Sequence, residues 1–136
     1  MTNDELAKSY LIKATARLNI LHSFIEEEAY SDVVREAQEV VELALKAMLR
    51  EMGIEPPKWH DVSGLILENR DKLPQKVAAN AERLAKISKW LRKERELSFY
   101  GDIDFIPTEE YSLEDVQRAR RDAQFVVGEA KKVISV

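Results

Sequence analysis

Cationic side chains gather near the end of a helical stretch that runs from Val77 to Arg95. Lys86, Lys89 and Lys93 recur on one face of that stretch, with Trp90 among them. Such cations could contact phosphate groups, and the indole ring could stack on a base. The same cations also complement the negative end of a helix dipole, and spacing alone favours this ordinary solvated face. Nearby arginines extend the set: Arg92, Arg95, Arg118, Arg120 and Arg121.

The sequence contains few residues that could act as metal ligands or nucleophiles through an imidazole or a thiol. The chain has two histidines, His22 and His60, and no cysteine. Neither histidine follows a glutamate by three residues, as a di-iron bundle requires, and the zinc-protease, P-loop and dinucleotide-binding motifs are absent. We interpret His60 as a packing or capping residue at a helix start and place His22 on the solvated side of the first helix. The sequence predicts no metal site and no cofactor.

The composition is that of one soluble globular domain spanning residues 1–136, with 45% hydrophobic and 34% charged residues. The net charge of −4 gives no general attraction for nucleic acid, so any such site must be a local patch. No apolar run approaches the length of a membrane span, and the acidic start does not suit a signal peptide. We therefore expect a cytoplasmic protein. Many Glu, Lys and Arg with few Asn and Gln are typical of a thermophile.

The stretch from Ala29 to Met52 is predicted to be the central helix. Its apolar residues cover so much of the helix that more than one neighbour is needed. A second copy of the chain could supply part of that cover, and we therefore expect a homodimer. The apolar positions are Val33, Val34, Ala37, Val40, Val41, Ala44, Leu45, Ala47, Met48 and Leu49, and the charged residues fall on the other side: Asp32, Arg35, Glu36, Glu39, Glu42, Lys46 and Arg50.

Three other segments, 7–25, 77–95 and 116–133, repeat apolar residues in steps of four and three. Capping boxes mark the starts of the first and the last of these helices, Thr2 with Glu5 and Ser112 with Asp115. A short helix is expected around residues 62–66. The sequence thus predicts an all-α, antiparallel up-and-down helical bundle of four long helices and one short helix.

Breaks in helical periodicity place the connections. Gly53 suits a left-handed helix C-cap, and Pro74 suits the first turn of the helix that continues to Arg95. Arg95 continues the apolar seam of that helix, so its guanidinium should point along the bundle. The segment from Phe99 to Tyr111 contains Gly101 and Pro107 and is predicted to be an ordered loop packed on the bundle end.

Taken together, several stretches carry a family resemblance: AYSDVVREAQEVVELALKAML, the loop GIEPPKWHD, and RKERELSFYGD followed by the capped helix SLEDVQRARRDA. In their order and spacing they resemble the HEPN family, small helical-bundle domains of prokaryotes and some higher eukaryotes. The likeness covers nearly the whole chain. It implies an antiparallel bundle, dimerisation and a link to nucleotides or RNA. Many such proteins are encoded beside a minimal nucleotidyltransferase, in toxin–antitoxin or related modules.

Active members of that family are metal-independent endoribonucleases with an Arg, four to six other residues, and then a His. In them the His acts on the ribose 2′-hydroxyl and the Arg stabilises charge that develops on the phosphate. This sequence lacks that His, and a tyrosine, with an ordinary pKa of about 10, is a poor base near neutral pH. The corresponding positions hold Tyr100, Gly101 and Asp102 counting from Arg95, or Leu97, Ser98 and Phe99 counting from Arg92.

The resemblance supports a non-catalytic HEPN protein that binds a nucleotide, RNA or a nucleotidyltransferase partner. Arg95 would hold phosphate, Lys89 and Arg92 would add positive potential, and Tyr100 would stack or hydrogen-bond. Alternatively, Arg95 pairs with Asp102 or with a glutamate of the central helix and closes the bundle end.

Two other functions remain open at this point. One is a divergent endoribonuclease that uses Arg95 with Tyr100 or Asp102. The other is a purely structural dimeric scaffold, which would need no ligand.

Overall fold

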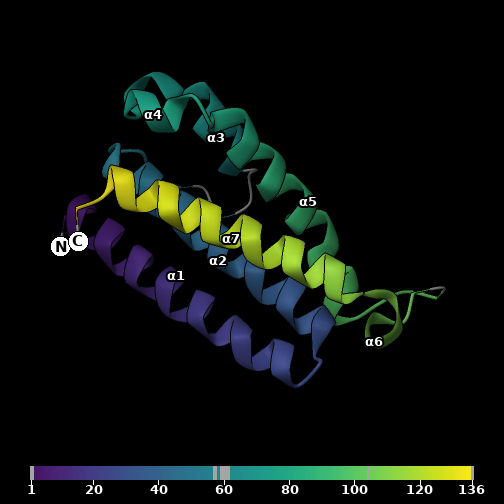
Figure 1. The fold of residues 1–136 in the computed structure, drawn as a ribbon. Coiled ribbons are helices and arrows are strands. Elements are labelled where there is room, and N and C mark those ends of the chain that lie inside the picture. Colours follow the sequence, from purple (N-terminus) through teal and green to yellow (C-terminus); the bar gives the residue numbers. More distant parts are fainter. Residues whose placement is uncertain (1, 57, 59–61, 104, 136) are drawn as a thin grey trace.

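The computed structural model describes residues 2–56, 58, 62–103 and 105–135, with backbone alone for 96–99. It is an all-α helical bundle, as predicted, and the described residues form no strand. Both chain ends lie at one end of the bundle (Figure 1). The elements in order are α1 (Asn3–Glu26), α2 (Tyr30–Glu51), α3 (Val62–Glu68), the 3-10 turn η1 (Arg70–Lys72), α4 (Gln75–Ala78), α5 (Ala81–Phe99), α6 (Pro107–Glu110) and α7 (Leu113–Val133).

Helix α2 is the central element of the bundle. It packs against α1, α5 and α7, and its apolar residues are buried. The width of its apolar stripe is therefore covered within one chain, so this feature does not require a second copy. Glu36 and Gln38 of α2 are buried too, because neighbouring helices also cover much of the polar side.

Local signals set the ends of the long helices. Thr2 and Glu5 exchange hydrogen bonds in a capping box at α1, and Ser112 and Asp115 do the same at α7. Gly53 follows α2 with a φ of 79°, a left-handed conformation that costs glycine little. These three predictions are confirmed.

The segment between α3 and α7 differs from the prediction. One helix was expected from Pro74 to Arg95, but α4 ends after one turn and α5 begins at Ala81. Asn80 directly precedes α5, a position at which Asn is favoured because its side chain can accept a bond from a helix amide. Val77 and Ala81 are buried on either side of the break, so the apolar stripe continues although the helix does not.

The segment from Phe99 to Tyr111 contains one helical turn, α6, inside the predicted loop. Pro107 occupies the first turn of α6, where its fixed φ is favourable and its missing amide costs nothing. None of the described helices is both long enough and apolar enough to cross a membrane.

Candidate functional site

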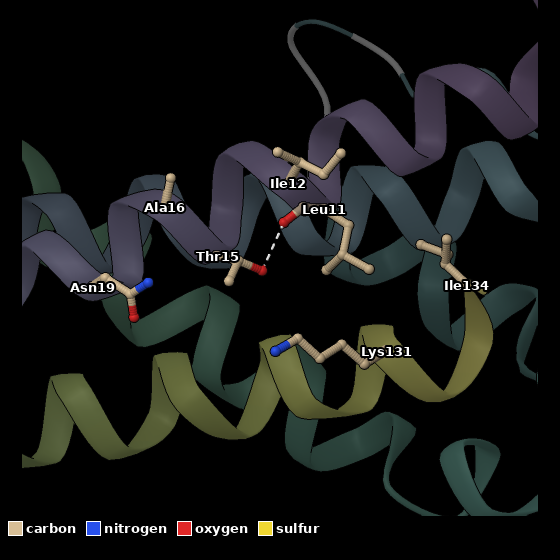
Figure 2. A pocket seen from close by; sticks show the side chains of 7 residues that line it. All are labelled: Leu11, Ile12, Thr15, Ala16, Asn19, Lys131 and Ile134. Carbon is tan, nitrogen blue, oxygen red and sulfur yellow. Dashed lines mark hydrogen bonds between the residues drawn. The ribbon is translucent and has the colours of Figure 1, made fainter. Parts of the chain in front are cut away.

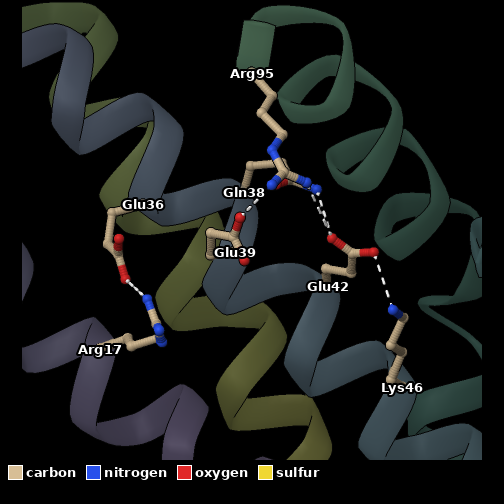
Figure 3. Close-up of polar contacts among 7 residues, drawn as sticks. All are labelled: Arg17, Glu36, Gln38, Glu39, Glu42, Lys46 and Arg95. Atoms are coloured by element: carbon tan, nitrogen blue, oxygen red, sulfur yellow. Dashed lines mark hydrogen bonds and ion pairs between the residues drawn. The ribbon is translucent and has the colours of Figure 1, made fainter. Parts of the chain in front are cut away.

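Arg95, near the C-terminal end of α5, turns its guanidinium toward α2. Its Nη2 lies 2.6 Å from Oε1 of Glu39, and its Nη1 lies 3.7 Å from Oε2 of Glu42 (Figure 3). The two glutamates are three residues apart on α2, so they project from one face. Of the alternatives weighed from the sequence, pairing with glutamates of the central helix is observed. Carboxylates of the same chain therefore balance the charge of Arg95.

Glu42 joins Arg95 to a larger polar network on α2. It accepts a hydrogen bond from Nε2 of Gln38 at 3.1 Å and pairs with Nζ of Lys46 at 3.2 Å (Figure 3). Burial by itself raises the pKa of Glu42, but the hydrogen bond from Gln38 and the contacts with Lys46 and Arg95 outweigh it. The net effect is to hold the pKa of Glu42 below its usual value. Glu42 is therefore an ionised carboxylate near neutral pH.

A second ion pair joins α2 to α1. Nη1 of Arg17 donates to Oε1 of Glu36 at 2.6 Å (Figure 3). This hydrogen bond and the charge of Glu36 raise the pKa of Arg17. Because Glu36 is buried, the pair satisfies a carboxylate that would otherwise be costly to remove from water.

Four cations lie on the outer face of α5 and form what we call the cationic strip: Lys86, Lys89, Arg92 and Lys93. All four are exposed. Its three lysines form no ion pair with any residue in the described part of the chain. The strip is therefore a concentration of positive charge on one face of a protein whose net charge is negative.

Trp90 is less available for stacking than its place in the sequence indicated. Its indole Nε1 donates to Oδ2 of Asp122 on α7 at 2.9 Å, and the guanidinium of Arg118 lies 4.1 Å from the ring centroid. A matching contact places Arg83 of α5 over the ring of Phe125 at 3.7 Å. These contacts join α5 to α7 and bring Arg118 close to the strip, as the sequence suggested.

Between α5 and α7 lie residues 100–103 and 105–111, which we call the tip loop. The backbones of Asp102 and Phe105 exchange two hydrogen bonds of 3.0 Å, and Oδ1 of Asp102 accepts from the amide of Ile103 at 2.8 Å. Gly101 has a φ of 77°, and a Cβ there would clash with the carbonyl oxygen of Phe105. Local hydrogen bonds and a required glycine therefore define the shape of this turn.

Tyr111 anchors the tip loop to α5. Its hydroxyl donates to Oε2 of Glu94 at 2.9 Å, and its ring meets Phe105 edge-to-face at a centroid distance of 5.6 Å. Burial, and then the hydrogen bond to Glu94, raise the pKa of Tyr111 above its ordinary value. The anchored loop leaves Tyr100 77% exposed and Ile103 94% exposed, so both side chains face solvent beyond the end of α5.

His22 takes no part in this region. His22 is exposed on α1 and lies 3.0 Å from Glu26, which agrees with its predicted solvated position. His60 lies outside the described residues. Among the described residues, no group of three or more His, Cys, Asp or Glu side chains could hold a metal ion.

Comparison with protein-family models gives a match to the HEPN domain over residues 7–134. The chain belongs to the HEPN family. Neither the comparison with curated proteins nor that with solved structures gave a match. The family match includes most of α1 and all of α2, α5 and α7, so the resemblance inferred from the sequence is confirmed.

The HEPN domain separates the residues that the sequence grouped as one site. Arg95 faces α2 and its glutamates, whereas Lys89 and Arg92 belong to the exposed face of α5. Tyr100 and Asp102 lie beyond the helix, in the tip loop. The structure thus presents an internally compensated arginine beside an exposed cationic surface.

Sequence reasoning missed some partners that shape this region of the HEPN domain. Trp90 donates a hydrogen bond to Asp122, which is 32 positions away in the sequence. Tyr111 donates one to Glu94, which is 17 positions away. No local spacing rule predicts such pairs, because they depend on how helices and loops pack in space. From the sequence, Glu39 and Glu42 were only two of several acidic residues of α2 that could pair with Arg95.

Proposed function

We propose that this HEPN protein is non-catalytic and binds RNA or nucleotide phosphates through the cationic strip of α5. The observation that carries the proposal is the pairing of Arg95 with Glu39 and Glu42. In active relatives the arginine stabilises charge on the scissile phosphate. An arginine already shared between two carboxylates offers a phosphate much less, since the anion would compete with groups in contact with it.

The absence of the family's histidine supports the same proposal. The positions at which it would stand hold Tyr100, Gly101 and Asp102. Asp102 directs its carboxylate to the amide of Ile103, and Gly101 is required by the turn. Gly101 and Asp102 therefore have structural explanations that need no proton transfer.

Binding is supported by the surface beside Arg95. Lys89, Arg92 and the two other cations of the strip lie on one exposed face of α5, at a spacing that can follow a phosphate backbone. Tyr100 follows the end of this helix, and its exposed ring suits stacking on a base. Arg95 has a structural role in this proposal and holds the end of α5 against α2.

A second candidate is docking of a protein partner such as a nucleotidyltransferase, within a toxin–antitoxin or related module. The exposed apolar residues of the tip loop favour it, because a partner that covers Ile103 and Ile106 would remove their apolar surface from water. The loop is also held in one shape by Gly101 and Tyr111, which lowers the entropy lost on docking.

The test is to measure binding and cleavage of RNA and a nucleotide panel in EDTA. We expect binding without cleavage, and a loss of roughly tenfold or more in the double variant Lys89→Glu and Lys93→Glu, with a shallower salt dependence. Arg95→Ala should leave most of the binding intact. The matched tip-loop variant Ile103→Ser should not change it.

Each other outcome identifies a different function. EDTA-resistant cleavage that is lost in Arg95→Ala would make the protein a divergent endoribonuclease and would overturn the proposal. If nucleic acid and nucleotides do not bind, but a co-encoded nucleotidyltransferase binds wild type and not Ile103→Ser, the second candidate is correct. If neither binds, a structural scaffold remains.

A further inference from the structure

A groove opens on the surface between α1 and α7, and we call it the α1–α7 groove. Its volume of about 540 Å³ lies within the range of about 300–1,000 Å³ that small-molecule sites occupy. Its floor is apolar, because Leu11 of α1 and Ile134 after α7 line it and both are almost fully buried. Figure 2 shows these two side chains between the helices. The other lining residues are Ile12, Thr15, Ala16, Asn19 and Lys131.

Helix spacing and a helix end give the α1–α7 groove its form. Leu11, Thr15 and Asn19 recur every four residues, so they lie along one face of α1 over roughly 12 Å. Helix α7 ends at Val133, and the next residue, Ile134, has an extended backbone while its amide still donates to the carbonyl of Ala130. The groove is therefore an elongated surface built by two packed helices.

Two hydrogen-bond donors at the α1–α7 groove have no partner in the described part of the chain. Lys131 forms no ion pair there. The side-chain amide of Asn19 likewise forms no hydrogen bond with a described residue. Thr15 differs, because its hydroxyl donates to the carbonyl of Leu11 at 2.9 Å (Figure 2). The lining thus combines an apolar floor, one positive charge and a free amide, and none of its residues is acidic.

We propose that the α1–α7 groove binds an amphipathic carboxylate, a molecule with one carboxylate and an apolar chain, such as a medium-chain fatty acid. The carboxylate accepts hydrogen bonds from Nζ of Lys131 and from the side-chain amide of Asn19. The apolar chain lies along α1 over Leu11 and Ile134. This inference goes beyond the proposed function and does not depend on it.

The charge of the groove selects this class of ligand. A carboxylate only accepts hydrogen bonds, and the free groups of Lys131 and Asn19 are both donors. A cationic ligand would meet the charge of Lys131 with no lining carboxylate to compensate it. A phosphate is better matched by several cations, as in the cationic strip, than by one lysine beside an apolar floor.

The apolar part of the groove supplies the driving force for the chain of the ligand. Leu11 and Ile134 are already buried against the core, so the floor is preformed and need not rearrange. Binding removes the apolar chain of the ligand from water, together with part of Ile12, which is 59% exposed at the edge of the groove. Affinity should therefore require both the carboxylate and the chain.

The α1–α7 groove is separate from the cationic strip. Helices α1 and α5 both pack against α2, and they lie on opposite sides of the bundle (Figure 1). The double variant Lys89→Glu and Lys93→Glu should therefore bind the amphipathic carboxylate as wild type does. Failure of RNA binding and failure of carboxylate binding are thus distinguishable.

Titration calorimetry with octanoate tests the proposal. Wild type should bind one octanoate per chain, and octanol, which has the same chain without the charge, should bind about tenfold more weakly or worse. Lys131→Met should lower the affinity for octanoate by about tenfold or more and leave that for octanol unchanged. Lys13→Met is the matched control, since it removes another exposed lysine of this side that does not line the groove, and it should change neither affinity.

A second pair of variants tests the place of binding. Thr15→Phe puts a ring into the space between α1 and α7 and should abolish binding of octanoate and octanol alike, whereas Thr15→Val keeps the size of the side chain and should retain it. Circular dichroism verifies that each variant stays folded.

Four results would overturn the inference. Wild type that binds no octanoate would do so, including the case in which a second copy of the chain covers the groove. Equal affinity for octanoate and octanol would show that the groove does not recognise a carboxylate. An effect of Lys131→Met no larger than that of Lys13→Met would exclude Lys131 as the ligand's partner, and binding that survives in folded Thr15→Phe would place the site elsewhere.

Discussion

Replacing Arg95 by alanine should lower stability more than its exposure indicates. The guanidinium lies 2.6 Å from Glu39 and 3.7 Å from Glu42, so its loss leaves two carboxylates of α2 with less compensation. The side chain of Arg95 is 44% exposed, whereas that of Glu39 is only 25% exposed. The unpaired charge therefore remains on the less solvated partner.

The expected loss of folding free energy lies between the values known for exposed and for buried ion pairs. A fully exposed pair contributes about 0.2–1 kcal/mol, and breaking a fully buried pair costs about 3–5 kcal/mol. Because water screens the half-exposed arginine, we expect Arg95→Ala to cost about 1–2 kcal/mol. For a domain of this length that corresponds to a fall in Tm of roughly 3–8 °C. Lys46 stays 3.2 Å from Glu42 and limits the loss at that carboxylate.

Calorimetry and urea unfolding at neutral pH measure this cost, and a double-mutant cycle assigns it. Arg95→Ala and Glu39→Gln should be non-additive, with a coupling of about 1 kcal/mol, since each removes the same ion pair. Lys93→Ala is the matched control. It removes a cation two residues away on the same helix, where no ion pair with a described residue is lost, and should change Tm by less than about 2 °C.

Two results would refute the reasoning. The first is an Arg95→Ala variant as stable as Lys93→Ala, which would mean that the pair with Glu39 contributes nothing to folding. The second is additivity of Arg95→Ala and Glu39→Gln. A variant of unchanged stability that had lost RNA binding would instead identify Arg95 as a phosphate ligand.

Three further predictions concern the network and the tip loop. Gly101→Ala should destabilise the tip loop by about 1–3 kcal/mol, because Gly101 has a φ of 77° and the carbonyl of Phe105 leaves no room for a methyl group. The loss should appear as a lower Tm and as faster amide exchange in the loop, and an unchanged Tm would contradict the prediction. Glu42 has a lowered pKa in the folded protein, so its contribution is complete above the unfolded value of about 4.3 and is lost as pH falls through the folded pKa. Glu42→Gln should therefore flatten the fall in stability below about pH 4, and an unchanged acid profile would count against it. Tyr111 has a raised pKa, so its contribution is present below about pH 10 and is lost as pH rises further. Tyr111→Phe should unfold with a weaker alkaline dependence, and equal slopes for variant and wild type would show that the hydrogen bond to Glu94 is not the cause.

Most of the fold could be predicted from the sequence, because helices depend on local order. Apolar steps of four and three place one face of each helix in the core, and capping boxes such as that of Thr2 and Glu5 satisfy amides within one turn. The break before Ala81 was missed because Val77 and Ala81 keep the stripe in phase across it. The short helix at Pro107 was missed because four residues are too few to show a period.

The family, the helical bundle and the loss of the catalytic histidine were determined by the sequence alone, since each depends on residue type and spacing. Only the tertiary structure decided which carboxylates pair with Arg95. The sequence left phosphate, Asp102 and the glutamates of α2 as alternative partners, and the packing of α5 on α2 brings Glu39 to 2.6 Å. It likewise decided that Trp90 is held by Asp122 and that Tyr100 remains exposed. Such pairings join residues far apart in the chain, and their distances follow from how the helices pack rather than from any local pattern.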